Sequence, residues 1–278
     1  MLTLISLLAQ HGAPAAEAHV IGGANPLVVA GIIFVITYAV IMSEKFNRAV
    51  VALLGGGLMI LSGVLNQHAA VQAIDWNTIG LLTGMMIIVA VMQRSGVFQY
   101  LAIWSAKKVN ARPWGILVML SIVTAILSAL LDNVTTVLLI APVTLLITEE
   151  LEIAPYPFLF SEIIFSNIGG AATLIGDPPN ILIGSMVESV TFNDFLVHIA
   201  PIVPLVFIAT LLPIYILWGR KLYASDEARQ RVLDFRESEA ITDSKLLIKS
   251  LIVLILVLVG FVLGHPMGIE PATVAMTG

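Results

Sequence analysis

The sequence contains no cysteine, which excludes disulfide bonds and thiolate metal sites. Charged residues are also scarce: they make up 11% of the 278 residues, whereas about a quarter of the residues in a soluble domain are charged. The few basic residues are not interleaved with stacking aromatic residues, so we expect no nucleic-acid partner. No group of side chains has the spacing of metal ligands, so we expect no structural metal and no cofactor.

Apolar sequence fills most of the chain. Hydrophobic residues make up 59% of it, and the mean hydropathy is +1.02. A soluble fold of this length cannot bury so much apolar surface, so an all-α polytopic membrane protein is predicted. Uncharged runs predict the segments within the bilayer at residues 26–43, 49–65, 76–93, 113–131, 133–148, 156–187 (interrupted), 195–219 and 250–269.

The basic residues indicate the orientation, because Lys and Arg favour cytoplasmic loops. All 13 fall at residues 45–48, 94–112 and 220–249. The last two clusters lie on the same side of the membrane only if residues 113–148 form a re-entrant hairpin with Asp132 near its tip. The length of the second hairpin arm, residues 133–148, supports a re-entrant hairpin. At about 24 Å it is too short to cross a hydrocarbon core of about 30 Å. We therefore expect a multi-pass cell-membrane protein with its N-terminus outside and the 220–249 loop in the cytoplasm.

Two segments are expected at or outside the membrane surface. Residues 1–25 read as an N-terminal tail or a weak signal peptide, because an apolar run there lacks preceding basic residues. Residues 96–110 carry Phe98 and Trp104 beside Lys107 and Lys108, a pattern typical of an interfacial amphipathic helix. The alternative for this second segment is a plain cytoplasmic loop.

A first polar cluster interrupts the apolar sequence at the predicted hairpin tip. It offers one carboxylate, one amide and two hydroxyls, from Asp132, Asn133, Thr135 and Thr136. Charge and a helix break are costly inside a bilayer, so such residues predict a functional site. Asn and Thr oxygens suit Na⁺, and Asp adds a charge or a titratable proton. The alternative is a hydrophilic turn with a capping Asp.

A second and stronger cluster lies at residues 166–180. Two adjacent glycines permit close packing, and Pro178-Pro179 removes two backbone donors, so a broken helix is predicted. The helix after the break would direct its N-terminal dipole at an anion or at the polar end of a substrate. The candidate ligands are Asn167, Gly169, Gly170, Thr173, Gly176, Asp177 and Asn180. The alternative is a kinked span whose polar groups satisfy one another.

Glu162 precedes the second cluster in an otherwise apolar arm. We expect it to lie near the cytoplasmic end of the arm and to reach water. The alternative is that it carries a proton.

Residues 49–55 and 272–278 match at Ala, Val, Ala and Gly, and each copy follows an apolar span and a short turn. The first copy follows a span that runs inward and the second a span that runs outward, which favours an inverted-topology repeat. The chain is therefore expected to be truncated at the start of its second repeat.

The motifs at residues 131–136, 168–173 and 175–180 resemble those of the ion-transporter superfamily. That group holds arsenite permeases, one class of sodium–proton antiporters and citrate/dicarboxylate carriers. Within it, the chain is most similar to citrate-transporter-like permeases of the pink-eyed-dilution (P protein) type, over roughly residues 26–278. The resemblance implies an elevator-type transporter, usually a homodimer, with the eleven candidate residues named above as its ion and substrate site. The chain lacks the Ser-Asn-Thr signature of the dicarboxylate carriers at both motifs.

The resemblance also implies a division of the chain into a fixed scaffold and a mobile transport domain. The expected parts are scaffold helices and an interfacial helix (26–112), the transport-domain hairpin and broken helix (113–194), a scaffold helix (195–219), a cytoplasmic linker (220–249) and the start of the second repeat (250–278).

These features predict a secondary active ion transporter that works by alternating access, is coupled to Na⁺ or H⁺, and moves a small inorganic ion or a small anion. The carboxylate pair favours a cation and protons, as in sodium–proton antiport, with Na⁺ near Asp132, Asn133 and Asp177. Helix N-termini favour an anion or a neutral oxyacid such as arsenite. An ion channel is the alternative, and an intramembrane aspartyl enzyme is a weaker one.

Overall fold

The computed structural model describes residues 20, 23–187, 190–264 and 267–278, so the predicted tail or signal peptide lies largely outside the described residues. The secondary structure of the described residues is helical, with no strand among them, as predicted for a polytopic membrane protein. The chain divides into two compact units, Met1–Asp75 and Trp76–Gly278.

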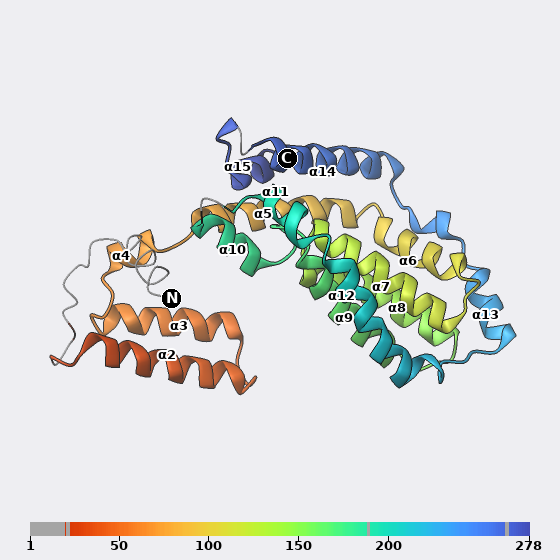
Figure 1. The fold of residues 1–278 in the computed structure, drawn as a ribbon, viewed down its shortest axis with the longest axis horizontal. Coiled ribbons are helices and arrows are strands. Elements are labelled where there is room, and N and C mark those ends of the chain that lie inside the picture. Colours follow the sequence, from red (N-terminus) through yellow and green to blue (C-terminus); the bar gives the residue numbers. More distant parts are fainter. Residues whose placement is uncertain (1–19, 21–22, 188–189, 265–266) are drawn as a thin grey trace. The chain divides into compact units, whose positions relative to one another are not determined.

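The first unit holds a pair of apolar helices, α2 (Pro26–Met42) and α3 (Arg48–Leu61), and the short α4 (Gln67–Gln72) (Figure 1). The side chains of Asn25 and Asn47 cap the two long helices. Helix α3 ends four residues earlier than predicted, at Leu61, because Gly63 takes a positive φ of 77° just beyond it. Its 14 residues reach about 21 Å, which is short for a complete span.

The second unit contains the remaining elements. In chain order these are α5 (Trp76–Gln93), α6 (Val97–Lys108), α7 (Pro113–Leu130), α8 (Asn133–Glu150), α9 (Tyr156–Gly170), α10 (Pro178–Met186), α11 (Phe192–Asp194), η1 (Phe195–Ile199), α12 (Val203–Ile214), η2 (Tyr215–Gly219), α13 (Asp226–Leu233), η3 (Glu237–Ala240), α14 (Ser244–Gly264) and α15 (Pro271–Thr277). Helices α7 and α8 form the predicted hairpin, and α9 packs against both of its arms (Figure 1).

The hairpin arms are long and apolar. Helices α5, α7, α8 and α14 each have the length and the composition to cross a membrane, and the bent pair described below would make a fifth such span among the described residues. Helix α8 continues two residues further than predicted, to Glu150, and reaches about 27 Å, so its length no longer favours a re-entrant arm.

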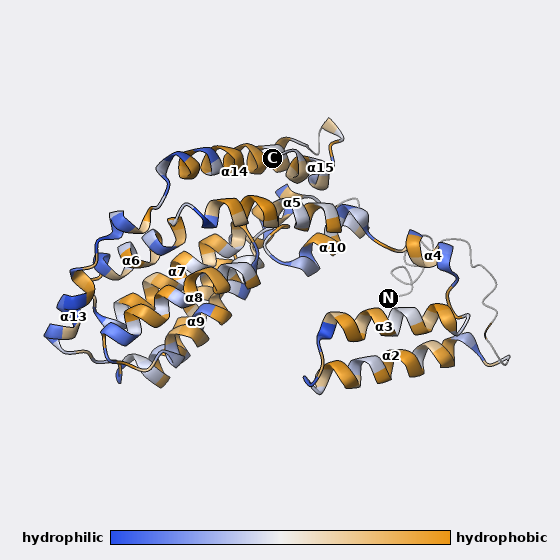
Figure 2. Ribbon diagram, turned by 180° about the vertical axis from the view of Figure 1, so that it is seen from behind, coloured by the Kyte–Doolittle hydropathy of each residue, from blue (hydrophilic) through white to orange (hydrophobic). Residues whose placement is uncertain are grey.

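The polar segment between η2 and α14 lies at the outer ends of the hairpin arms. Lys107 of α6 donates to Glu237 of η3 at 2.6 Å, and Arg231 of α13 pairs with Glu152 just beyond α8 at 2.6 Å. Thr242 Oγ1 donates to the carbonyl of Arg94 at the end of α5, at 2.6 Å. These contacts bring the second and third basic clusters to one end of the unit, as the charge pattern predicts; Figure 2 shows α13 in blue, against the mainly orange hairpin.

The linker predicted at residues 220–249 is partly helical, and the predicted start of the following span is wrong. The linker contains α13, η3 and the first six residues of α14. Helix α14 begins at Ser244, six residues before the predicted span, because Asp243 Oδ1 accepts from the N–H groups of Lys245 and Leu246 and so stabilises an earlier start.

The predicted span at residues 195–219 is bent rather than continuous. Its helices Phe192–Ile199 and Val203–Gly219 are bent by 53° at the intervening break. Pro201 and Pro204 remove backbone donors at the bend, which prevents a continuous helix. The π-helical turn η1 lies directly before the bend, and η2 lies at the C-terminal end of the pair.

Helix α6 confirms the prediction of a helix near residues 96–110, but it does not lie free on a surface. It packs against both α7 and α8, and Phe98 is fully buried against protein. The two copies of the internal repeat each begin a helix, α3 and α15.

Candidate functional site

The hairpin turns within two residues. Helix α7 ends at Leu130, and Asp132 takes an extended conformation (φ −156°, ψ 159°) as the N-cap of α8. One Asp132 carboxylate oxygen accepts from the backbone N–H of Thr135 at 2.7 Å. The capping role expected for a simple turn is therefore present, and the second carboxylate oxygen remains available to a ligand.

The broken helix is the second part of the site. Helix α9 ends at Gly170, and α10 begins at Pro178 with Asp177 as its N-cap. Thr173 Oγ1 donates to the carbonyl of Ala129 on α7 at 2.5 Å and accepts from the N–H of Gly176 at 3.1 Å. The break is thereby fixed to the first hairpin arm.

Asn180 fixes the break from its other side. Its side-chain amide donates to the carbonyl of Thr173 at 3.0 Å and to that of Gly170 at 3.4 Å. Carbonyls freed by the helix break would otherwise have no donor inside a bilayer. Thr173 and Asn180 thus hold the two sides of the break in place.

The three glycines of the second cluster permit close packing. A Cβ atom on Gly169 would collide with the backbone of Ala125 on α7, and one on Gly170 would lie 2.6 Å from the carbonyl oxygen of Gly176. The glycines therefore let the break lie against α7, and their role here is steric.

Asn133 brings the two predicted clusters together. Its side-chain amide donates to Asn167 Oδ1 at 3.0 Å and to Asp177 Oδ1 at 3.3 Å. The orientation of Asn167 is fixed, because its own amide donates to the carbonyl of Ile163 at 2.7 Å and leaves its oxygen to face Asn133. The oxygen of Asn133 is buried and has no protein partner among the described residues, so an acceptor remains for a ligand.

The site is electronegative. The Asp132 carboxylate is near enough to repel that of Asp177. Residues 113–219, which include the hairpin, the broken helix and the bent pair, contain no Lys or Arg. Two carboxylates without a basic partner favour a bound cation or proton. Within the described residues, no group of three or more His, Asp or Glu side chains could hold a metal.

The same contact sets the level of the hairpin tip within the unit. Asn133 at the tip meets Asn167 near the end of α9, so the tip lies level with the point where the broken helix is interrupted.

Thr136 lies one helical turn beyond Asp132 on α8. Its side chain is fully buried on α8, and its hydroxyl has no partner among the described residues. The sequence analysis also misses two contacts: Ser128 Oγ donates to the carbonyl of Ser166 at 2.6 Å, and Thr144 Oγ1 donates to Glu162 Oε1 at 2.5 Å. The expectation that Glu162 reaches water is wrong, because Glu162 is 1% exposed beneath α8.

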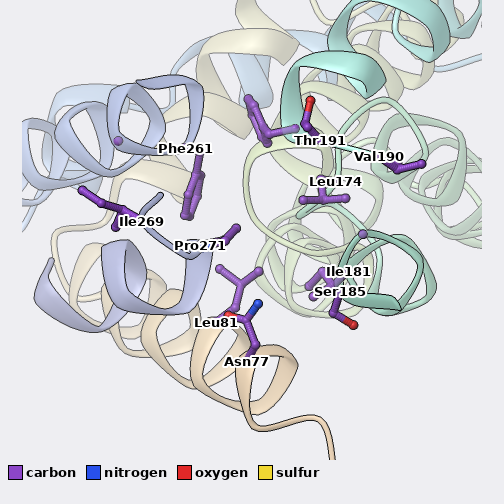
Figure 3. Close-up of a pocket in the computed structure, with 13 residues that line it drawn as sticks. Asn77, Leu81, Leu174, Ile181, Ser185, Val190, Thr191, Phe261, Ile269 and Pro271 are labelled. Atoms are coloured by element: carbon purple, nitrogen blue, oxygen red, sulfur yellow. The ribbon is translucent and has the colours of Figure 1, made fainter. Parts of the chain in front are cut away.

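Two cavities flank the broken helix. A small pocket of about 100 Å³ lies between the break and the elements α5, α14 and α15; in Figure 3, Leu174 and Ile181 face Leu81, Phe261 and Pro271 across it. An apolar groove of about 500 Å³ lies between α7, α9 and α12. Neither cavity is lined by Asp132, Asn133 or Asp177, so the candidate ion site is distinct from both.

A helical hairpin whose polar tip meets a broken helix, among apolar helices of membrane-spanning length, is the arrangement of a membrane transporter. Residues 38–278 match the family CitMHS, described as "Citrate transporter". The chain belongs to this citrate transporter family.

Relatives with transporter names support this assignment. An "uncharacterized transporter" of Mycobacterium tuberculosis is 46% identical over 255 residues, which cover 90% of this chain and 59% of the relative. The "46 kDa membrane protein" of Mycobacterium leprae is 46% identical over 258 residues, with the same two shares. The human "P protein" is 40% identical over 196 residues, 67% of this chain and 23% of the P protein. The chain thus spans less than two thirds of the length of these relatives.

Proposed function

We propose that this chain carries the ion-handling site of a secondary active transporter that works by alternating access. The observation that carries the proposal is the contact of Asn133 with both Asn167 and Asp177. It joins a hairpin tip and a helix break that are separate in the sequence, and both elements leave oxygen ligands unused.

The coupling ion in this proposal is Na⁺ or H⁺. The free oxygen of Asn133 and the carboxylates of Asp132 and Asp177 are hard ligands, and the absence of Lys and Arg from residues 113–219 leaves their charge uncompensated. A cation that binds there would hold the tip against the break. A small anion would then bind only once this cation is present, which couples the two species.

Citrate is the first substrate to test, because of the family description, and arsenite and sodium–proton exchange follow. The proposed orientation places the N-terminus outside and the segment at 220–249 in the cytoplasm. The aromatic contacts of Trp218 with Tyr156 (5.9 Å) and Phe160 (5.3 Å) support an interface at that end of the unit. The inverted repeat, the elevator motion and a homodimer belong to the same proposal.

A direct test is flux through the purified full chain in proteoliposomes, with imposed gradients of sodium, protons, citrate and arsenite. We expect saturable uptake of one substrate that depends on a sodium or a proton gradient. Flux that never saturates and ignores every gradient would instead support the channel alternative. For the enzyme alternative, two aspartates must share a proton, whereas here the Asn133 amide lies against Asp177.

A further inference from the structure

Glu162 is a buried acid that the site at the hairpin tip does not use. Its side chain is 1% exposed, one carboxylate oxygen accepts from Thr144 Oγ1, and the other has no partner among the described residues. An ionised carboxylate in this position would lose its hydration for a single neutral hydrogen bond. The protonated acid loses far less on burial.

No charged residue faces Glu162. Helix α9 packs against α7, α8 and α12, and residues 113–130 and 203–214 contain no titratable side chain. On α8 the titratable residues are Glu149 and Glu150, at its far end, and on α9 itself the other one is Tyr156, in the first turn. Helix α6, which packs on the outside of the hairpin, carries Tyr100 and two lysines at its end, one of which is paired with Glu237.

Unpaired hydroxyls face the same region from α7. Ser128 contacts Ser166, and one helical turn earlier on each helix lie Thr124 and Glu162. Because residues four apart share a helix face, Thr124 and Glu162 occupy corresponding positions of the α7–α9 interface. Thr124 is fully buried with an unpaired hydroxyl, and so is Ser121, one position along the same face.

The hydroxyl of Thr148 does not extend the site. Thr148 lies one turn beyond Thr144 on α8, is 1% exposed, and donates to the backbone carbonyls of Thr144 (2.9 Å) and Leu145 (3.0 Å) rather than to another hydroxyl. The site on the α8 side therefore consists of Glu162 and the hydroxyl of Thr144.

We propose that Glu162, with the hydroxyls of Thr144, Thr124 and Ser121, forms a proton-binding site separate from the ion site at the hairpin tip. The proton is taken up from water and returned to water, and no covalent bond other than the O–H bond of the acid forms or breaks. Because Glu162 belongs to the broken helix and Thr144 to the hairpin, its charge state favours or opposes the packing of these two elements. The inference rests on the proposed transport function for its physiological meaning.

Infrared spectroscopy of the full chain in lipid tests the site without reference to transport. We expect a carboxylic-acid carbonyl band at neutral pH that is lost in Glu162→Gln and kept in Glu149→Gln, a matched change at an exposed glutamate near the end of α8. Glu162→Gln keeps the size of the side chain and the acceptor for Thr144. Thr144→Val provides a second variant, which keeps the acid and should shift its band. A wild-type spectrum with no band that these changes remove or shift would overturn the proposal.

Proton movement tests the coupling. With a pH-sensitive dye inside proteoliposomes and a sodium or citrate gradient imposed, we expect wild type and Glu149→Gln to change the luminal pH. We expect no change for Glu162→Gln, which should still exchange labelled for unlabelled sodium or citrate at equilibrium. Proton movement at the wild-type rate in Glu162→Gln would refute the coupling. If even wild type moves no protons, the proton-coupled form of the proposed function fails, and the infrared result still decides whether the site exists.

Discussion

The side-chain amide of Asn133 lies 3.3 Å from the carboxylate of Asp177, so the first residue of α8 touches the residue that caps α10. This contact holds a hairpin tip against a helix break. Each element alone would leave hydrogen-bonding groups without protein partners, which is costly where water is absent. Together they satisfy one another in part and leave oxygens for an ion.

Asp177→Asn should remove cation binding and keep the fold. The Asn side chain can still accept from Asn133, so the contact survives while one negative charge is lost. We expect sodium chloride, compared with choline chloride, to raise the thermal unfolding temperature of wild type and to leave that of the variant unchanged. Asp132→Asn should behave in the same way, and both variants should lose coupled transport.

Asp234→Asn is the matched control for the two aspartate variants. Asp234 is exposed on the polar segment and accepts from Gln230 at 2.9 Å, which Asn also permits. The control should retain the full response to sodium. An undiminished sodium response in both Asp132→Asn and Asp177→Asn would remove these two residues from the site.

Gly169→Ala should destabilise the protein. Its Cβ would meet the backbone of Ala125, which cannot move without separating α9 from α7, so we expect a cost of about 1–3 kcal/mol. Gly56→Ala is the contrast, because a Cβ at Gly56 meets nothing within 4 Å and Ala favours a helix, so stability should stay equal or rise by up to about 1 kcal/mol. Thermal unfolding followed by tryptophan fluorescence distinguishes the two. Equal losses at both glycines would show that packing at Gly169 is not tight.

The sequence predicts most helix positions, because a long uncharged apolar run that ends at a charged residue or a proline is typical of a single helix. The bounds of α5, Trp76–Gln93, agree at both ends. It also predicts the two halves of the site, since each half combines polar residues with a helix break. Their meeting through Asn133 is a tertiary contact with no local signal. The bend at residues 200–202 was missed although Pro201 and Pro204 mark it, because uncharged prolines do not interrupt a hydropathy pattern.

The position of Glu162 could not be derived from the sequence for a related reason. An acidic side chain in the second turn of a helix can either reach water or be buried against a hydrogen-bonding partner. Thr144, the residue that decides between them, lies on another helix. Helical spacing alone does not determine which faces of α8 and α9 meet.

The contact between Lys107 and Glu237 should weaken in acid. The hydrogen bond from Lys107 lowers the pKa of the Glu237 carboxyl below its ordinary value of 4.5. A lowered pKa in the folded state means that the stabilisation is complete above pH 4.5 and is lost as the pH falls below that value. Hydrogen exchange of residues 234–243 should therefore accelerate in that acid range more than exchange in α6. In Lys107→Met, residues 234–243 should exchange at the accelerated rate at neutral pH as well. An unchanged exchange rate in that variant would show that the ion pair does not hold residues 234–243 in place.

The proposed orientation can be measured with single cysteines, because the natural sequence has none. Tyr223, which is 81% exposed in the polar segment, and Ala24, which is exposed before α2, are suitable positions. A membrane-impermeant maleimide should label Ala24→Cys in intact cells and Tyr223→Cys only after the membrane is opened. Leu117→Cys, at a position that is 1% exposed, is the control and should stay unlabelled in both conditions. Labelling of Tyr223→Cys in intact cells would place the polar segment outside.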